Sequence, residues 1–105
     1  MISDKTIQEV VKQIVLSANP RQVILFGSYA RKEMRSDSDI DIMVLVNDTE
    51  INLKNISQAL YKQVYDITHI PCDILVERES DFHERSILPT LERQILQEGH
   101  VLYAA

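Results

Sequence analysis

The chain has 105 residues, of which 45% are hydrophobic and 26% are charged, which is the length and composition of one folded domain. Two glycines and three prolines exclude the collagen-like and low-complexity classes. The formal net charge of −5 argues against direct binding of nucleic acid, because affinity for phosphate chains depends on Lys and Arg. We therefore expect residues 1–105 to form a single domain that does not bind nucleic acid by itself.

The cysteine content and the N-terminus indicate the compartment. Cys72 is the single cysteine, so it has no partner for an internal disulfide, and no Cys/His cluster has zinc-ligand spacing. The first ten residues lack the basic and apolar segments of a secretory signal, and no stretch approaches 18 apolar residues. We expect a soluble cytoplasmic protein with no membrane segment.

The apolar residues recur with two periods, helical and strand-like, that alternate along the chain. The first helix has apolar residues at helical spacing from Ile7 to Val15, with Ser3 or Asp4 as its cap. In chain order we predict a helix over 4–17, a strand over 22–26, a short helix over 28–32, a polar turn over 33–38, a strand over 40–46, a helix over 50–68, a strand over 72–76, a charged stretch through 85, a helix over 90–98 with Gly99 as its C-terminal cap, and an edge strand over 101–103.

This order of elements predicts an α/β (α+β) fold with one small sheet and no internal repeat. Alternating helices and strands favour parallel pairing, but the link between the first two strands is too short to be a clear crossover helix. We therefore expect a mixed sheet.

The segment GSYARKEMRSDSDID, residues 27–41, lies between two apolar strands and contains the first candidate site. Gly27 and Ser28 follow a strand directly and begin a short helix. The free N–H groups of a helix start favour an anion, the Ser28 hydroxyl adds a donor, and Gly27 allows close approach of a phosphate. Gly-Ser after a strand is also common in plain turns, so these two residues alone leave both interpretations open.

The second candidate feature is a pair of acids in the motif Asp39-x-Asp41. Residues two apart in a strand project to the same side, so the two carboxylates converge, and like charges at close range are unfavourable without a cation between them. Carboxylate oxygens suit Mg²⁺. If the strand that begins near Asp73 lies beside the second strand, three acids share one end of the sheet, and such a trio can hold two metal ions.

Two alternatives to the acidic site remain to be compared. Residues 36–39 can be a polar turn, with Asp41 as an edge-strand charge that faces water. A calcium loop would use Asp37, Asp39 and Asp41, but Ile42 stands where that loop requires Gly, so we exclude it. No P-loop motif is present in the sequence.

Basic residues lie between the two candidate features. Arg31, Lys32 and Arg35 can contact triphosphate oxygens or form a solvated loop, and Arg31 is the best candidate for nucleotide binding. The three histidines have no partner spacing, and Cys72 is expected to be a small buried strand residue.

Gly27-Ser28, ten intervening residues, Asp39-x-Asp41 and Asp73 on a following strand together resemble the nucleotidyltransferase signature of the DNA polymerase β superfamily. Two segments resemble the minimal nucleotidyltransferases, the MNT antitoxins that are paired with HEPN-domain toxins. They are ILFGSYARKEMRSDSDIDIMVLV and, near the C-terminus, ILQEGHVLY. The resemblance implies a mixed sheet with helices mainly on one face. One departure is Lys32, since many members of the family have Gly after the Ala-Arg pair.

The resemblance also implies the ligands and residue roles. ATP would be the substrate and Mg²⁺, as two ions, the cofactor, with Gly27, Ser28 and Arg31 on the nucleotide. Asp39, Asp41 and Asp73 would be the catalytic residues and metal ligands, with Asp73 as a ligand or a general base. The implied reaction is transfer of AMP to a hydroxyl, expected to be a tyrosine of a cognate HEPN ribonuclease toxin, with release of pyrophosphate.

Two rival hypotheses belong to other classes. The protein can be a non-catalytic antitoxin that neutralises its HEPN partner by forming a complex, and the acidic net charge fits a basic ribonuclease surface. It can also be a small-molecule nucleotidyltransferase, although 105 residues leave no length for an additional acceptor domain.

Overall fold

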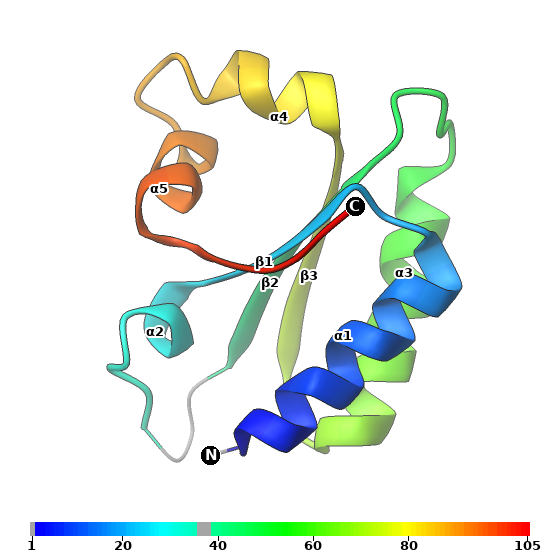
Figure 1. Ribbon diagram of the computed structural model, residues 1–105, viewed down its shortest axis with the longest axis vertical. Helices are drawn as coiled ribbons and strands as arrows, with labels where there is room; N and C mark the ends of the chain where they lie inside the picture. Colours follow the sequence, from blue (N-terminus) through cyan, green and yellow to red (C-terminus); the bar gives the residue numbers. More distant parts are fainter. Residues whose placement is uncertain (1, 36–38) are drawn as a thin grey trace.

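The computed structural model describes residues 2–35 and 39–105, which form a sheet covered by helices on both faces (Figure 1). The last three residues of the expected polar turn, 36–38, lie outside this part of the chain. The elements are α1 (Asp4–Ala18), β1 (Gln22–Phe26), α2 (Gly27–Ala30), β2 (Ile40–Val46), α3 (Leu53–Thr68), β3 (Cys72–Arg78), α4 (Glu79–Arg85), α5 (Leu91–Glu98) and β4 (His100–Ala104).

The sheet has the strand order β3-β2-β1-β4. Strand β1 is antiparallel to both β2 and β4, whereas β2 and β3 are parallel, so the expectation of a mixed sheet is confirmed. The antiparallel step explains the short link between β1 and β2, because it does not require a crossover helix. The parallel step uses α3 as its crossover.

The two long helices, α1 and α3, cover one face of the sheet (Figure 1). Val10 and Ile14 of α1 are fully buried against inward residues of the sheet, as are Leu60 and Val64 of α3. Ser3 caps α1, since its hydroxyl oxygen accepts a hydrogen bond from the Thr6 N–H at 3.2 Å. The larger part of the core therefore lies between the sheet and the apolar faces of α1 and α3, which the helical periodicity of the sequence predicts.

The two short helices, α4 and α5, cover part of the opposite face (Figure 1). Phe82 of α4 and Ile95 of α5 are buried against Ile24, Met43 and Leu45, which alternate with the residues of the first face. Helix α4 was not predicted, because its sequence, ESDFHER, contains one apolar residue and no helical stripe. A single aromatic side chain that reaches the sheet anchors this helix.

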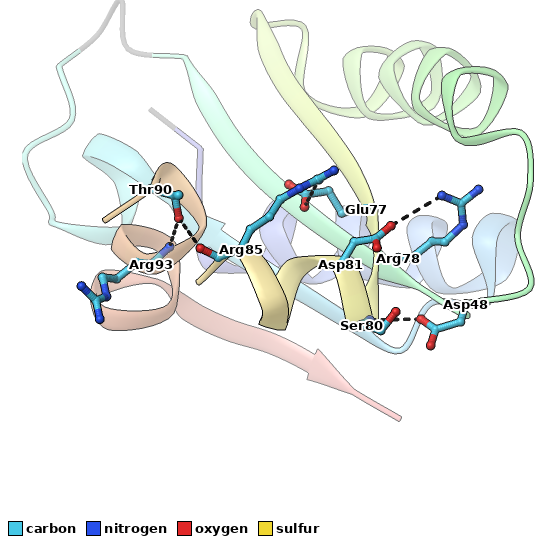
Figure 2. A network of polar contacts seen from close by, with 8 residues as sticks. All are labelled: Asp48, Glu77, Arg78, Ser80, Asp81, Arg85, Thr90 and Arg93. Atoms are coloured by element: carbon cyan, nitrogen blue, oxygen red, sulfur yellow. Dashed lines mark hydrogen bonds and ion pairs between the residues drawn. The ribbon is translucent and has the colours of Figure 1, made fainter. Parts of the chain in front are cut away.

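Polar contacts join α4 to its neighbours on both sides (Figure 2). The Ser80 N–H donates to the Asp48 carboxylate at 3.0 Å, at the end of β2. The Thr90 hydroxyl donates to the Arg85 carbonyl at 2.8 Å and accepts from the Arg93 N–H at 3.2 Å, so one side chain ends the α4–α5 link and caps α5. These bonds fix the orientation of the two short helices over the sheet.

The last elements agree closely with the sequence analysis. Gly99 ends α5, and its N–H donates to the Ile95 carbonyl at 2.8 Å. Strand β4 forms an edge of the sheet beside β1. None of the helices in the described ranges is long and apolar enough to cross a membrane.

Candidate active site

Asp41 and Asp73 lie side by side on the parallel strands β2 and β3, as in-register partners near the start of each strand. Both project to the face opposite α1 and α3, because the residues on either side of each one, Ile40 and Ile42 or Cys72 and Ile74, belong to the core beneath those helices. The condition set in the sequence analysis, that the strand of Asp73 lie beside the second strand, is therefore met.

The proximity of the two acids is visible in the proton affinity of Asp41. The pKa of Asp41 is raised from 3.8 to about 6, mainly by burial and then by the charge of Asp73. In its protonated form Asp41 donates a hydrogen bond to the Asp73 carboxylate, which raises the pKa further, while Arg31 opposes the shift. Two carboxylates held together in this way form a pair whose doubly ionised state is stabilised by a nearby positive charge.

Asp39 lies just before β2 and is exposed. Its charge raises the pKa of Asp41 and also that of Cys72, so it is near both. In residues 2–35 and 39–105, no three side chains of His, Cys, Asp or Glu converge closely enough to enclose an ion. The structure thus assembles the Asp41–Asp73 pair and places Asp39 beside it as a third charge.

The donor set of this site suits a hard divalent cation. It consists of carboxylate oxygens, and the carboxylate repulsion that raises the pKa of Asp41 is the feature that a cation relieves. Asp39, Asp41 and Asp73 are the residues that would hold Mg²⁺, and the charge that Mg²⁺ supplies when bound would stabilise negative charge on phosphate oxygens.

Gly27 follows β1 directly, next to the strand position of Asp41. Phe26 is the register partner of Asp41 in the antiparallel pair, and Gly27 has φ of +71°, which an L side chain rarely adopts. A Cβ atom on Gly27 would overlap the Oδ2 atom of Asp41. Glycine is therefore required here both by the backbone and by the space that the carboxylate occupies.

Ser28 and Arg31 continue from Gly27 along α2. Ser28 lies in the first turn of α2, where N–H groups have no partner within the helix. The Arg31 guanidinium is 3.4 Å from a Glu33 carboxylate oxygen and 3.8 Å from one of Glu98. Since Arg31 also lowers the pKa of Asp41, its charge acts on the acidic pair. The sequence-predicted nucleotide residues are thus beside the acids.

Residues 5–105 match the family described as Polymerase beta, Nucleotidyltransferase. The chain belongs to this nucleotidyltransferase family. It is 33% identical over 106 residues to a protein of Methanocaldococcus jannaschii that is named a protein adenylyltransferase, and the match covers 98% of this chain and 100% of that protein.

Solved structures share the fold of this nucleotidyltransferase. A toxin-antitoxin structure with AMP-PNP matches at a TM-score of 0.67 and 21% identity, over 99% of this chain and 75% of that one. The structure of a tri-AMPylated HEPN toxin of Shewanella oneidensis in complex with its MNT antitoxin matches at a TM-score of 0.58 and 21% identity, over 96% of this chain and 69% of that one. The expected nucleotidyltransferase fold is confirmed.

Lys32, the departure from the family pattern, has left-handed backbone geometry. Its φ is +58°, where many members of the family have glycine, the residue that adopts this conformation without steric cost. The turn at this position is therefore formed by a lysine under steric strain.

Two hollows border residues of the candidate site. One, of about 140 Å³, is lined by Gly27 and Arg31 together with residues of α5. The other, of about 570 Å³, opens between α3 and β3 and reaches Asp73. The sequence analysis predicted neither, because each is formed by elements far apart in the chain, and helical spacing alone does not give the distance between a helix and a neighbouring strand.

Proposed function

We propose that this nucleotidyltransferase transfers AMP from ATP to a hydroxyl group of a protein, with Mg²⁺ as cofactor and pyrophosphate as the second product. The observation that carries the proposal is the Asp41–Asp73 pair beside Gly27, in a chain that matches the full length of a relative named as a protein adenylyltransferase. The proposed acceptor is a tyrosine of a HEPN ribonuclease toxin.

The residue roles follow from their places around the pair. Gly27 and Ser28 offer backbone N–H groups and a hydroxyl to the β- and γ-phosphates, and Arg31 offers a guanidinium. Asp39, Asp41 and Asp73 would hold Mg²⁺. Gly27 keeps the Cα surface bare, so that the phosphates and the Asp41 carboxylate can approach one another without a side chain between them.

The chemical step exchanges a phosphoanhydride bond of ATP for a phosphoester bond to the acceptor hydroxyl. The acceptor oxygen forms a bond to the α-phosphorus, and the bond from that phosphorus to the bridging oxygen of the β-phosphate breaks. The electron pair of the broken bond leaves with pyrophosphate, and the acceptor proton passes to the Asp73 carboxylate, which acts as general base. Asp73 lies on the edge strand β3 and is exposed, so an incoming acceptor can reach it.

Solved complexes support the proposed partner and the proposed nucleotide. A structure of a toxin-antitoxin with AMP-PNP and one of an AMPylated HEPN toxin with its MNT antitoxin share this fold over nearly the whole chain. These relationships support ATP as the nucleotide and a HEPN toxin as the partner. We place the protein in the cytoplasm, where such a ribonuclease would act on RNA.

A labelling experiment tests the reaction. The purified protein is incubated with Mg²⁺, the HEPN-type protein encoded beside its gene, and ATP labelled at either the α- or the γ-phosphate. We expect α-label on the partner and none with the Asp41→Asn variant, which keeps the shape of the side chain. Label from the γ-phosphate alone would establish phosphoryl transfer and overturn the proposal.

A second candidate function is neutralisation by binding alone. The net charge of −5 favours association with a basic ribonuclease surface, independently of catalysis. An Asp39→Asn/Asp41→Asn double variant separates the two functions. If cells that express the toxin are rescued by this variant as well as by the wild type, binding is sufficient; if rescue is lost while the complex still forms, catalysis is required.

A further inference from the structure

We propose that three aliphatic side chains at the junction of α4 and α5, those of Ile87, Leu88 and Leu91, form the surface on which the acceptor protein docks. This aliphatic cluster receives an apolar patch of that protein that is framed by basic side chains. The inference rests on the proposed function, and it specifies which part of this chain holds the protein substrate.

The exposure of the aliphatic cluster is the first argument. Ile87 is 69% exposed, Leu88 is 63% exposed and Leu91 is 48% exposed, and the three lie within five residues of one another. Among residues 2–35 and 39–105, neither of the two buried clusters includes any of them. A group of neighbouring aliphatic side chains left in water is typical of a surface that a partner covers.

The backbone that carries the aliphatic cluster is held by hydrogen bonds. The Ile87 N–H donates to the Glu84 carbonyl at 3.4 Å, and the Leu88 N–H donates to the Arg85 carbonyl at 3.2 Å. The Thr90 N–H donates to the Leu88 carbonyl at 2.8 Å, and its hydroxyl donates to the Arg85 carbonyl (Figure 2). The link therefore presents its aliphatic side chains in a fixed arrangement, and little chain entropy is lost when a partner covers them.

The aliphatic cluster belongs to the same face of the sheet as the acids. Helices α4 and α5 cover the face to which Asp41 and Asp73 project, and α1 and α3 cover the other one (Figure 1). Leu91 also lines the hollow that contains Gly27 and Arg31, so the cluster continues as far as the nucleotide residues. A molecule that covers the cluster is therefore on the side from which the acids are approached.

The size of the molecule lets one partner reach both the aliphatic cluster and the acids. The Cα atoms extend over 34 × 28 × 21 Å. A stable protein interface buries about 800 Å² on each partner, which is a patch roughly 30 Å across. One interface of that size covers most of a face of this chain. Since a small-molecule acceptor has no use for such a surface, the cluster favours a protein acceptor.

The charges beside the aliphatic cluster favour a basic partner. The Arg85 guanidinium is bound to the Glu77 carboxylate at 2.8 Å, so an acid of the same chain compensates this cation. Glu84 is exposed and, within the described ranges, forms no ion pair. The Arg93 side chain is directed away from Arg85 and Glu77 (Figure 2). With a net charge of −5 on the chain, basic groups around the partner's apolar patch are complementary to this surface.

Two other exposed aliphatic residues provide a matched control. Leu16 is 72% exposed on α1, and Ile51 is 89% exposed before α3. The double variants Ile87→Ser/Leu88→Ser and Leu16→Ser/Ile51→Ser each remove two exposed aliphatic side chains, so both should fold. Leu91 is left unchanged, because it also lines the hollow beside the nucleotide residues.

The experiment measures by calorimetry, without nucleotide, the Kd of the complex with the HEPN-type protein encoded beside the gene. We expect Ile87→Ser/Leu88→Ser to raise this Kd about tenfold or more, with the Kd for ATP unchanged. The Leu16→Ser/Ile51→Ser variant should stay close to the wild-type Kd. An unchanged Kd of the link variant, an equal effect of the control variant, or no binding by the wild type overturns the inference.

Because docking is measured without ATP, it is tested separately from transfer. If the partner docks through Ile87 and Leu88 but receives no label, the proposed function fails and the docking surface stands. Sedimentation of the protein alone tests a second copy as the occupant. A wild-type dimer that is lost in Ile87→Ser/Leu88→Ser would assign the aliphatic cluster to self-association and overturn the inference.

A charge-reversal variant tests the chemistry assigned to the partner. Glu84→Lys should weaken docking, and the loss should be larger at low salt than at high salt, because salt screens exposed charges. Glu9→Lys, which reverses an exposed acid on α1, is the control and should leave the Kd close to that of the wild type. Equal effects of the two variants would contradict the basic frame that we assign to the partner.

Discussion

The Asp41 carboxylate occupies the space that a Cβ atom of Gly27 would need. Gly27 lies at the end of β1 and Asp41 near the start of β2, so two residues 14 positions apart in sequence are complementary in shape. This contact joins the proposed phosphate residues to the proposed metal ligands. A change at Gly27 is therefore transmitted to Asp41 without any intermediate residue.

We predict that Gly27→Ala lowers both stability and activity. The positive φ costs an L residue about 1–2 kcal/mol, and the new methyl group displaces the Asp41 carboxylate as well. Urea unfolding should show at least that loss, and AMP transfer should fall more than tenfold. Ser28→Ala is the control, because it leaves the backbone and Asp41 unchanged and should unfold at nearly the wild-type midpoint. An alanine variant with wild-type stability would contradict the proposed role of Gly27.

Lys32→Gly is predicted to raise the free energy of unfolding, which is the opposite of the effect expected for Gly27→Ala. At an ordinary position glycine destabilises by about 0.5–1 kcal/mol relative to alanine, but at a φ of +58° it relieves about 1–2 kcal/mol of strain. We expect the free energy of unfolding to rise by the difference, about 0.5–1 kcal/mol. Lys32→Val, which is β-branched, should lower it. The prediction is wrong if urea midpoints rank valine above glycine.

The strongest sequence signals are those whose meaning is local. Apolar periodicity predicted α1, α3 and the strands. The spacing of Gly27, Asp39 and Asp41 predicted the acidic site and the phosphate-binding residues. Helix α4 was missed because its stability comes from one residue, Phe82, packed against the sheet, and a lone aromatic residue in a charged segment has no periodicity.

Features formed between distant segments were also beyond the sequence analysis. The hollow between α3 and β3 depends on how closely the helix approaches the strand, and the left-handed turn at Lys32 is not evident from a lysine. The register of Asp41 with Asp73 was stated only as a condition, that the third strand lie beside the second. Pairing partners of strands are decided by packing over the whole sheet, and the local pattern leaves them open.

Glu77 is predicted to make stability depend on pH. Its side chain is mostly buried on β3, receives a hydrogen bond of 2.8 Å from Arg85 (Figure 2), and has its pKa raised from 4.5 to about 7. Burial is the main cause and the hydrogen bond with Glu92 the second, while Arg85 opposes both. The pair shares a proton, since the same contact lowers the pKa of Glu92.

The direction in which stability changes with pH follows from proton binding to Glu77. Between pH 4.5 and 7 the folded protein holds a proton on Glu77 that the unfolded chain releases, so the free energy of unfolding decreases as pH rises through this window. The lowered pKa of Glu92 acts below that window. Glu77→Gln does not titrate, so the Tm of this variant minus that of the wild type should be larger at pH 8 than at pH 5. A flat or falling difference would show that Glu77 is ionised throughout.

Glu98→Gln is predicted to strengthen ATP binding. Arg31, the proposed phosphate contact, is held 3.8 Å from Glu98 in a half-exposed ion pair, and such pairs contribute about 0.2–1 kcal/mol. Release of the guanidinium should lower the KM for ATP by a factor of about 1.4 to 5, which is this energy expressed as a ratio. The effect should vanish in an Arg31→Ala background, since the two residues then have nothing to couple. If Glu98→Gln lowers the KM equally with and without Arg31, the carboxylate acts on the phosphates by its charge alone, and Arg31 has no part in nucleotide binding.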